Sequence, residues 1–186
     1  VGGLKYADLD HSGTIDAKDQ TWIFDPVPDF NWGLNVQLGY KNFDLSMFFQ
    51  GVYGVDVYNN QKFQTDFWSL TDAGSNKGNR MLGAWTEDNT SSKIPALTTN
   101  NTGDEGRAST YFVEHGNWMK LRTLQLGYNF SDSLLKKLHM TSARVYVSGQ
   151  NLFTWKSSSF TISDPENPNW AYPHSSSVSF GLQLSF

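Results

Sequence analysis

The sequence contains no cysteine, so a disulfide framework does not hold its fold together. No apolar run approaches the roughly 18 residues that a membrane-spanning helix needs. The net charge of −4 leaves no basic surface of the kind that binds nucleic acid, so no nucleic-acid partner is expected. The sequence opens on Val1 without a signal peptide, and we therefore expect targeting information to lie upstream.

The composition favours β-structure, because aromatic residues make up 15% of the sequence and glycine occurs 16 times. The clearest pattern is SSSVSFGLQLSF at 175–186, where apolar residues from Val178 to Phe186 take every second position. Strict alternation predicts a strand with one apolar and one polar face. Such a strand suits a soluble sandwich, whose apolar face meets a core, and equally a transmembrane barrel, whose apolar face meets lipid.

Four further stretches alternate in the same way. WGLNVQLGY (32–40) and the run at 43–50 are separated only by Lys41-Asn42, which predicts a tight hairpin. LQLGYNF (124–130) also alternates, but its approach at 118–121 is out of phase, so we expect a β-bulge near Arg122-Thr123.

The fourth stretch is RVYVSGQNLFTW (144–155), whose facing is ambiguous from the pattern. We favour an outward facing for Val145, Val147, Phe153 and Trp155. In the strands with the most regular alternation, the apolar residues at every second position share one face. We predict that these side chains face lipid: Leu34, Val36, Leu38, Leu45, Met47, Leu126, Leu182 and Leu184.

The connections between these strands alternate in length. The turn at 41–42 is minimal, whereas residues 55–117 and 156–175 form long connections, and residues 131–142 form a shorter one with room for one helical turn. Outer-membrane barrels have short turns at one end and long extracellular loops at the other, and aromatic residues gather at their strand ends. This pattern favours the barrel over the sandwich, which has no reason to place its long connections at one end.

Several ordered stretches resemble one known family. They are LKYADLDHSGTIDAKD, FNWGLNVQLGYKNFDLSMFFQGVYG, AWTEDNTSSKIPAL, YFVEHGNWMKLRTLQLGYNF, ARVYVSGQNLFTW and SFGLQLSF, of which LRTLQLGY and RVYVSGQNLF are the most specific. In this order they resemble the C-terminal end of the SusC/RagA family of TonB-dependent outer-membrane transporters.

This resemblance implies a bacterial outer-membrane location and an all-β fold: about five C-terminal strands of a large antiparallel transmembrane β-barrel with long extracellular loops. It implies import of oligomeric nutrients, glycans or peptides, and it implies no enzymatic activity. The implied partners are the remainder of the barrel with its plug domain, a SusD-type surface lipoprotein, TonB acting through the missing N-terminal part, and outer-membrane lipid. The sequence itself departs from the family by lacking the plug and most of the strands, so we interpret it as a barrel piece whose open edges need the rest of the barrel.

Two domains are expected: an extracellular loop at 1–31 and the barrel segment at 32–186. The loop contains DLDHSGTIDAKD (8–19), whose oxygen-bearing residues follow the spacing of a calcium-binding loop, with Gly13 at the position of the sharp turn. The candidate ligands are Asp8, Asp10, Ser12, Thr14, Asp16 and Asp19. Ser12 is neutral and Asp19 is shorter than the usual Glu, so a metal-free loop rich in Asx-turns is the alternative.

No catalytic set is evident, because the four histidines have no partner at ligand spacing and no nucleophile elbow occurs. Four aromatic residues in the long connections are candidates for contact with substrate or a partner protein, or for packing the loops together: Trp68, Trp85, Trp170 and Tyr172. Two other classes stay open from the pattern, a soluble calcium-dependent β-sandwich that binds carbohydrate and the anchor of a surface adhesin.

Overall fold

The computed structural model describes residues 2–67, 70, 75–100, 104–167 and 171–186. Its described residues form two compact units. One contains the described residues of 2–25 and 57–114, and the other contains 26–56, 115–167 and 171–186. No helix in the described part of the chain is long and apolar enough to cross a bilayer.

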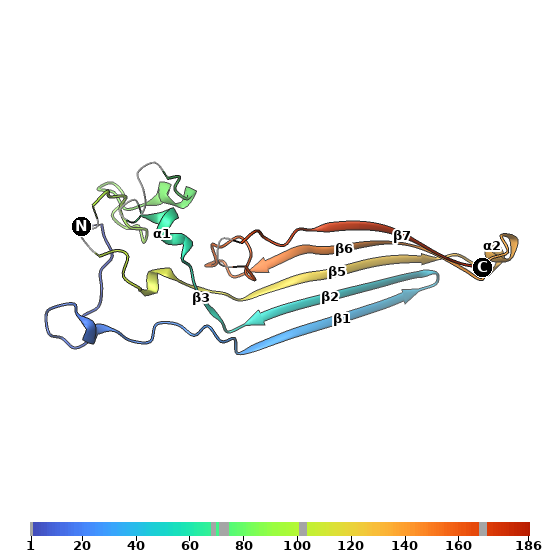
Figure 1. Ribbon diagram of the computed structural model, residues 1–186, viewed down its shortest axis with the longest axis horizontal. Coiled ribbons are helices and arrows are strands. Elements are labelled where there is room, and N and C mark those ends of the chain that lie inside the picture. Colours follow the sequence, from blue (N-terminus) through green and yellow to red (C-terminus); the bar gives the residue numbers. More distant parts are fainter. Residues whose placement is uncertain (1, 68–69, 71–74, 101–103, 168–170) are drawn as a thin grey trace. The chain divides into compact units, whose positions relative to one another are not determined.

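The second unit is built on a five-stranded antiparallel sheet in the order β1-β2-β5-β6-β7 (Figure 1). Its strands are β1 (Phe30–Tyr40), β2 (Phe43–Tyr53), β5 (Trp118–Asn129), β6 (Ser142–Lys156) and β7 (Ser177–Ser185). All five strands that alternation predicts are therefore present, and the Lys41-Asn42 hairpin is confirmed by the pairing of Tyr40 with Phe43. The short helix α2 (Asp132–Lys137) lies in the β5–β6 connection, where one helical turn was expected.

The pairing register separates the sheet into two unlike faces. Directly opposed residues share a face, so the pairs that link neighbouring strands trace rows across the sheet. One row is wholly apolar: Leu38, Leu45, Leu126, Val147 and Phe180. The adjacent row on the other face is wholly polar: Gln37, Ser46, Gln125, Ser148 and Ser179. We call these the apolar face and the polar face.

The apolar face carries large side chains that remain exposed, among them Leu38 at 58% and Phe180 at 85%. Val145 and Val147 pair with Tyr128 and Leu126, and Phe153 pairs with Leu121, so the facing favoured for β6 is confirmed. All eight side chains that parity assigned to lipid lie on this face. A water-facing protein rarely leaves so wide an apolar surface uncovered, so a hydrophobic environment is expected around it.

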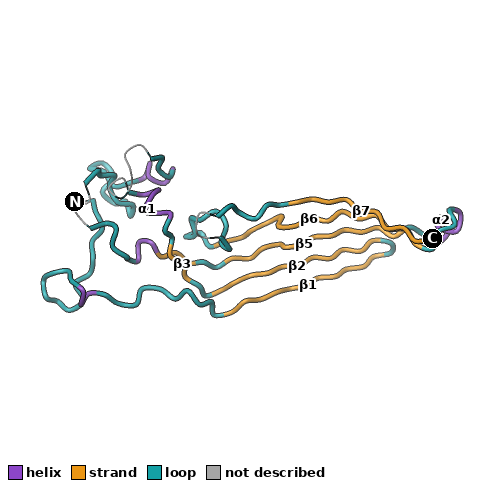
Figure 2. The backbone as a smooth tube through the Cα atoms, viewed as in Figure 1, coloured by secondary structure: helices purple, strands orange, loops and turns teal. Residues whose placement is uncertain are grey.

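Figure 2 shows the strands of the sheet in orange and the loops and turns in teal. The sheet has two ends. We call the end with the Lys41-Asn42 turn and α2 the turn end, and the opposite end the loop end. On the polar face at the turn end, Arg144 forms an ion pair with Asp44, which also accepts a hydrogen bond from Asn129 Nδ2 at 3.0 Å. These charges reinforce the view that the polar face meets an aqueous space.

Two glycines on the polar face differ in what covers them. Gly39 and Gly181 occupy one cross-strand row, but the ring of Tyr146 lies over Gly181, where an added Cβ would be 2.1 Å from Tyr146 Cζ. An added Cβ at Gly39 would meet nothing within 4 Å. The sheet therefore needs glycine at 181 for close packing, whereas glycine at 39 has no such constraint.

Gly181→Ala is expected to lower the free energy of unfolding of the intact barrel by about 1–3 kcal/mol, because Tyr146 must leave its position. Gly39→Ala is the matched control and should be neutral or stabilising by up to about 1 kcal/mol, since alanine loses less backbone entropy than glycine. Urea unfolding of the intact barrel in lipid vesicles measures both. Equal effects at the two positions would contradict the packing described for Tyr146.

The other unit has its own core. It contains η1 (Ala17–Asp19), α1 (Gln61–Asp66), η2 (Asn79–Gly83) and η3 (Thr110–Phe112), and β3 (Asp56–Tyr58) pairs with β4 (Val113–His115) where the chain passes between the units. Phe67 and Phe112 are almost fully buried, and the Phe63 and Phe112 rings stack with centroids 4.3 Å apart. The long connection at 57–114 is thus a packed element with the first 25 residues, and not an open loop. The predicted boundary at residue 31 separates an extracellular loop from the barrel segment by their expected roles, and it stays a prediction.

Candidate functional site

The loop at 8–19, which we call the Asp loop, brings three of its four predicted acidic ligands together. Carboxylate oxygens of Asp8, Asp10 and Asp19 all lie within 4.8 Å of one another. These are the residues at positions 1, 3 and 12 of the calcium-loop pattern, and an oxygen cluster of this size suits a hard cation. Asp16 lies outside the cluster and instead caps η1, accepting a hydrogen bond from Lys18 N at 2.7 Å.

Backbone N–H groups fold the Asp loop around its carboxylates. Asp8 accepts hydrogen bonds from Ser12 N at 3.1 Å and from Gly13 N at 2.8 Å. Gly13 has φ of +82°, which favours glycine at this turn. The Ser12 hydroxyl donates to the Thr14 carbonyl at 3.1 Å, so these two predicted ligands contact each other.

Asp19 closes the Asp loop from its far end. Its two oxygens accept hydrogen bonds from Leu9 N and Asp16 N, each at 2.7 Å. The N–H groups of Asp16 and Leu9 hold the pKa of the Asp19 carboxyl below its ordinary value. The carboxylate is therefore ionised at neutral pH, as a calcium ligand must be.

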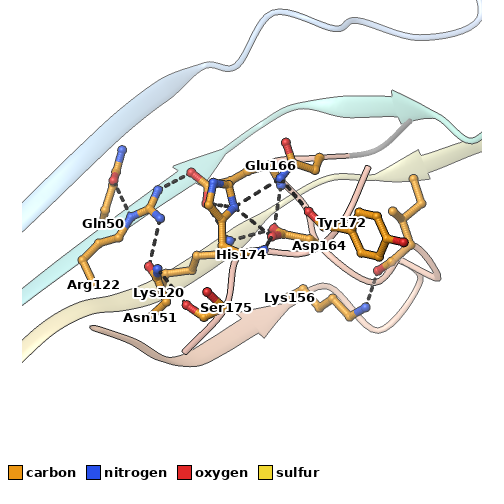
Figure 3. A network of polar contacts seen from close by, with 12 residues as sticks. Gln50, Lys120, Arg122, Asn151, Lys156, Asp164, Glu166, Tyr172, His174 and Ser175 are labelled. Carbon is orange, nitrogen blue, oxygen red and sulfur yellow. Dashed lines mark hydrogen bonds and ion pairs between the residues drawn. The ribbon is translucent and has the colours of Figure 1, made fainter. Parts of the chain in front are cut away.

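A second constellation lies on the polar face at the loop end, and the sequence did not reveal it. Lys120 of β5 is 2% exposed and donates to Asp164 Oδ1 at 2.7 Å and to Glu166 Oε2 at 2.6 Å. Arg122 forms an ion pair with Glu166 and donates to Gln50 Oε1 at 2.8 Å (Figure 3). We call Lys120, Arg122, Asp164, Glu166 and His174 the ion cluster.

The predicted β-bulge places Arg122 in the ion cluster. The pairing of β5 with both neighbouring strands shifts between Leu121 and Thr123. Against β2, Arg122 is the extra residue, whereas against β6 it lies opposite two residues, Asn151 and Leu152. In a regular strand Lys120 would share a face with Leu124 and Leu126. The bulge changes the alternation, so that Lys120 lies on the polar face while these leucines lie on the apolar face. On β6 the corresponding irregularity includes Asn151 with φ of +49°, whose Oδ1 accepts from Arg122 Nη1 at 3.3 Å.

Asp164 is the centre of the cluster. Its carboxylate accepts from Lys120 Nζ, from the backbone N–H groups of Glu166 and His174 at 3.1 and 2.8 Å, and contacts His174 Nδ1 at 3.0 Å. Burial by itself raises the pKa of the Asp164 carboxyl, but the hydrogen bonds from Lys120, His174 and Glu166 overcome it and hold this pKa well below its usual range. Asp164 therefore stays ionised throughout the physiological range of pH.

The spacing of Asp164, Glu166 and His174 would also suit a metal ion, because their ligand atoms lie within 4.8 Å of one another. The two carboxylates are, however, already neutralised by Lys120 and Arg122. A cation added here would meet two positive charges at contact distance. We therefore interpret the ion cluster as an internal charge network, and not as a metal site.

The aromatic residues predicted to make contacts fall in different places. Trp85 is half-buried. Its ring packs against Gly2, where an added Cβ would lie 2.7 Å from Trp85 Cε3. The backbone N–H of Trp85 donates to the Ile94 carbonyl at 2.9 Å. Tyr172 is 94% exposed. Trp68 and Trp170 lie outside the described residues.

The residues of the ion cluster carried only a weak signal in the sequence. Lys120 and Arg122 are two cations close together on one strand, which is the only local hint of an anion nearby. Their acidic partners are 44 residues away in a segment without periodicity, so no local pattern could link them.

Comparison with known proteins places these features in a family. The chain is 34% identical to the TonB-dependent receptor P3 of Formosa agariphila over an alignment of 204 residues. This alignment covers 100% of this chain and 19% of that receptor. It is 30% identical over 189 residues to the TonB-dependent receptor SusC of Bacteroides thetaiotaomicron, covering 97% of this chain and 17% of SusC. The structure of the RagAB peptide transporter matches with a TM-score of 0.76 at 27% identity, over 93% of this chain and 19% of that chain.

The chain belongs to the SusC/RagA family of TonB-dependent transporters. No family model matches the sequence, so the assignment rests on these relatives and on the shared fold. This SusC/RagA segment is part of a large antiparallel β-barrel of the bacterial outer membrane, and it spans 19% and 17% of the lengths of the two curated relatives named above. Those two relatives are named as TonB-dependent receptors.

Proposed function

We propose that the protein to which this segment belongs imports oligomeric nutrients, either glycans or peptides, across the outer membrane. The observation that carries the proposal is the match of the five-stranded sheet to a peptide transporter over 93% of the chain. The two unlike faces support it, because a transport barrel needs an apolar surface toward lipid and a polar surface toward its lumen. The soluble sandwich is not favoured, since the described residues form only one large sheet and its apolar face stays exposed.

The same proposal includes the partners. β1 and β7 are the two edges of the sheet and each needs a neighbouring strand, which the remainder of the barrel would supply. Energy would come from TonB through the part of the protein beyond this chain, and a SusD-type lipoprotein would close the extracellular end. Tyr172 suits contact with such a lipoprotein, because an exposed aromatic ring on a segment braced by Asp164 loses little entropy on binding.

Uptake by cells that carry the intact transporter tests the importer directly. A panel of fluorescent oligopeptides and oligosaccharides is expected to contain at least one compound whose uptake requires both the transporter and TonB. Purification from the same cells should yield a lipoprotein partner, and Tyr172→Ala should weaken its retention by about 2 kcal/mol if the ring is a central contact. Uptake that is unchanged in cells without TonB would contradict active import.

We also propose that the Asp loop binds Ca²⁺ through Asp8, Asp10 and Asp19, with Ser12 and Thr14 as further oxygen ligands and Asp16 acting directly or through water. The support is the close approach of three carboxylates in the spacing of a calcium loop. Each carboxylate has about four acceptor positions, so the hydrogen bonds from backbone N–H groups leave room for a metal bond. Calcium would order this loop in the extracellular medium, where even an affinity in the millimolar range suffices.

Isothermal titration of the intact transporter with Ca²⁺ is expected to show a saturable heat with a dissociation constant in or below the range of about 0.1–1 mM. The double variant Asp8→Ala plus Asp10→Ala should lose this heat, because it removes two of the three converging carboxylates. Asp25→Ala, an acidic residue outside the loop pattern, is the control and should retain it. A titration of the parent protein without calcium-dependent heat would end the calcium proposal.

A further inference from the structure

The part of the chain between β6 and β7 that the structure describes, residues 157–167 and 171–176, is attached to the sheet at several points. We call it the β6–β7 segment. The ion cluster joins its residues Asp164 and Glu166 to Lys120 and Arg122 of β5, and His174 contacts the two carboxylates (Figure 3). These contacts connect parts of the chain 44 to 46 residues apart, so they fix the segment to the polar face and not merely to its own strands.

The charges balance within the cluster. Two cations, Lys120 and Arg122, face two carboxylates, Asp164 and Glu166, and the Lys120 and Asp164 side chains are only 2% and 4% exposed. Asp164 is saturated, because its contacts with Lys120, His174 and the N–H of Glu166 occupy roughly the four positions that a carboxylate offers. A network in which every member has a partner in a low-dielectric site is rigid.

The segment has a second attachment, to Lys156 at the end of β6. Phe160 and Ile162 of the same segment are 3% and 1% exposed. The Lys156 side chain of β6 reaches the Ile162 carbonyl and lies 5.7 Å from the centroid of the Phe160 ring. Lifting the segment from the sheet would therefore break the ion cluster and the contacts of Lys156 at the same time.

The segment is also braced internally. The N–H groups of Glu166 and His174 donate to the Asp164 carboxylate, and that of Asn167 donates to the Asp164 backbone carbonyl. Asn167 Nδ2 donates to the Tyr172 carbonyl at 3.3 Å. At its far end, the Ser176 hydroxyl donates to Asn151 O at 2.6 Å, next to the β6 irregularity that also holds Arg122. One carboxylate, Asp164, thus organises both the shape of the segment and its attachment to β5.

We propose that the β6–β7 segment is a fixed element of the polar face at the loop end, held by the ion cluster, and not a moving gate. Lys120 and Arg122 are positioning residues in this proposal, because they act on the passage through the segment they hold. If the protein is an importer, a fixed segment here means that substrate entry is controlled by another part of the extracellular opening. Only this consequence of the proposal rests on the proposed import function. The attachment itself is measurable without any transport assay, so the two proposals can fail separately.

Hydrogen exchange of the intact transporter in lipid nanodiscs tests the attachment, because a gate opens spontaneously even without substrate and exposes its amides. Peptides that report the amides of Glu166, Asn167 and His174 are expected to be as strongly protected as those from β5. Lys120→Met should raise their exchange rate at least tenfold, since it leaves Asp164 without its cation. Arg144→Met removes a cation from the same face at the turn end and should leave these amides unchanged.

Glu166→Gln is the second variant in case Lys120→Met does not assemble. It keeps Lys120 paired with Asp164 and removes the one negative charge that Glu166 shares between Lys120 and Arg122, so it should raise exchange in the β6–β7 segment by a smaller factor while the barrel still folds. Exchange at the rate of an open loop in the parent protein would overturn the proposal. Protection that persists in Lys120→Met, or in Glu166→Gln where that is the variant that folds, would overturn it as well.

Discussion

Val36→Arg is expected to lower the free energy of unfolding of the barrel by about 2–4 kcal/mol, the cost of an arginine on the lipid face near the bilayer midplane. Val36 lies at the middle of β1 and pairs with Met47 on the apolar face. No partner for a positive charge is present there, because the residues of the same row on β5 and β7 are Leu124 and Val178. The charge would therefore meet hydrocarbon directly.

Gln37→Arg is the matched control, one residue away on the same strand. Gln37 begins the wholly polar row that continues through Ser46 and Gln125, so an arginine at this position remains hydrated. Its cost should stay within about 0.5 kcal/mol, as for most substitutions at solvated positions. Unfolding of both variants in vesicles with urea gives the comparison, and equal costs would show that the facing of β1 is assigned incorrectly.

Lys120→Met is expected to lower the free energy of unfolding by about 3–5 kcal/mol, the usual effect of removing one partner of a buried ion pair. Methionine keeps most of the volume of lysine, so the loss would come from the charge and not from a cavity. Asp164 would then be left nearly buried with a negative charge and without its closest cation.

The control for this variant is Lys41→Met, at an exposed position of the β1–β2 turn, where lysine contacts only the Tyr40 ring among the interactions described. Its effect should be within about 0.5 kcal/mol. The pair of variants is measured by the same vesicle unfolding experiment. A change smaller than about 1 kcal/mol in Lys120→Met would place the ion cluster in the class of solvent-screened surface pairs.

Periodicity explains why the sheet could be predicted from the sequence. Alternation over 32–40 and 178–186 specifies which side chains share a face, and the phase change before LQLGYNF locates the bulge at Arg122. These are local signals, because a strand with a solvated face and an apolar face must alternate along its own length. The same rule places Val145 and Phe153 of β6 on one face, because the irregularity near Asn151 leaves the alternation on either side of it in phase.

The parts that could not be predicted depend on contacts between distant residues without a period. Phe67 and Phe112 form a core within 57–114, a region whose polar composition indicates only a long connection. Lys120 and Asp164 likewise meet through a segment that has no repeating pattern. In the Asp loop the opposite holds, because its residues are close in sequence and the spacing alone predicted that Asp8, Asp10 and Asp19 would converge.

We expect the large sheet of β1, β2, β5, β6 and β7 to separate lipid from an aqueous lumen. The chain has no cysteine, so single cysteines at residues 34–38 of β1 can each carry a nitroxide spin label without competing sites within this segment. Collision with oxygen, which partitions into lipid, and with a water-soluble nickel chelate reports the surroundings of each label in the intact barrel. The account predicts period-two alternation, with labels at 34, 36 and 38 accessible to oxygen and labels at 35 and 37 accessible to the chelate. Equal accessibility to the chelate at all five positions would contradict it.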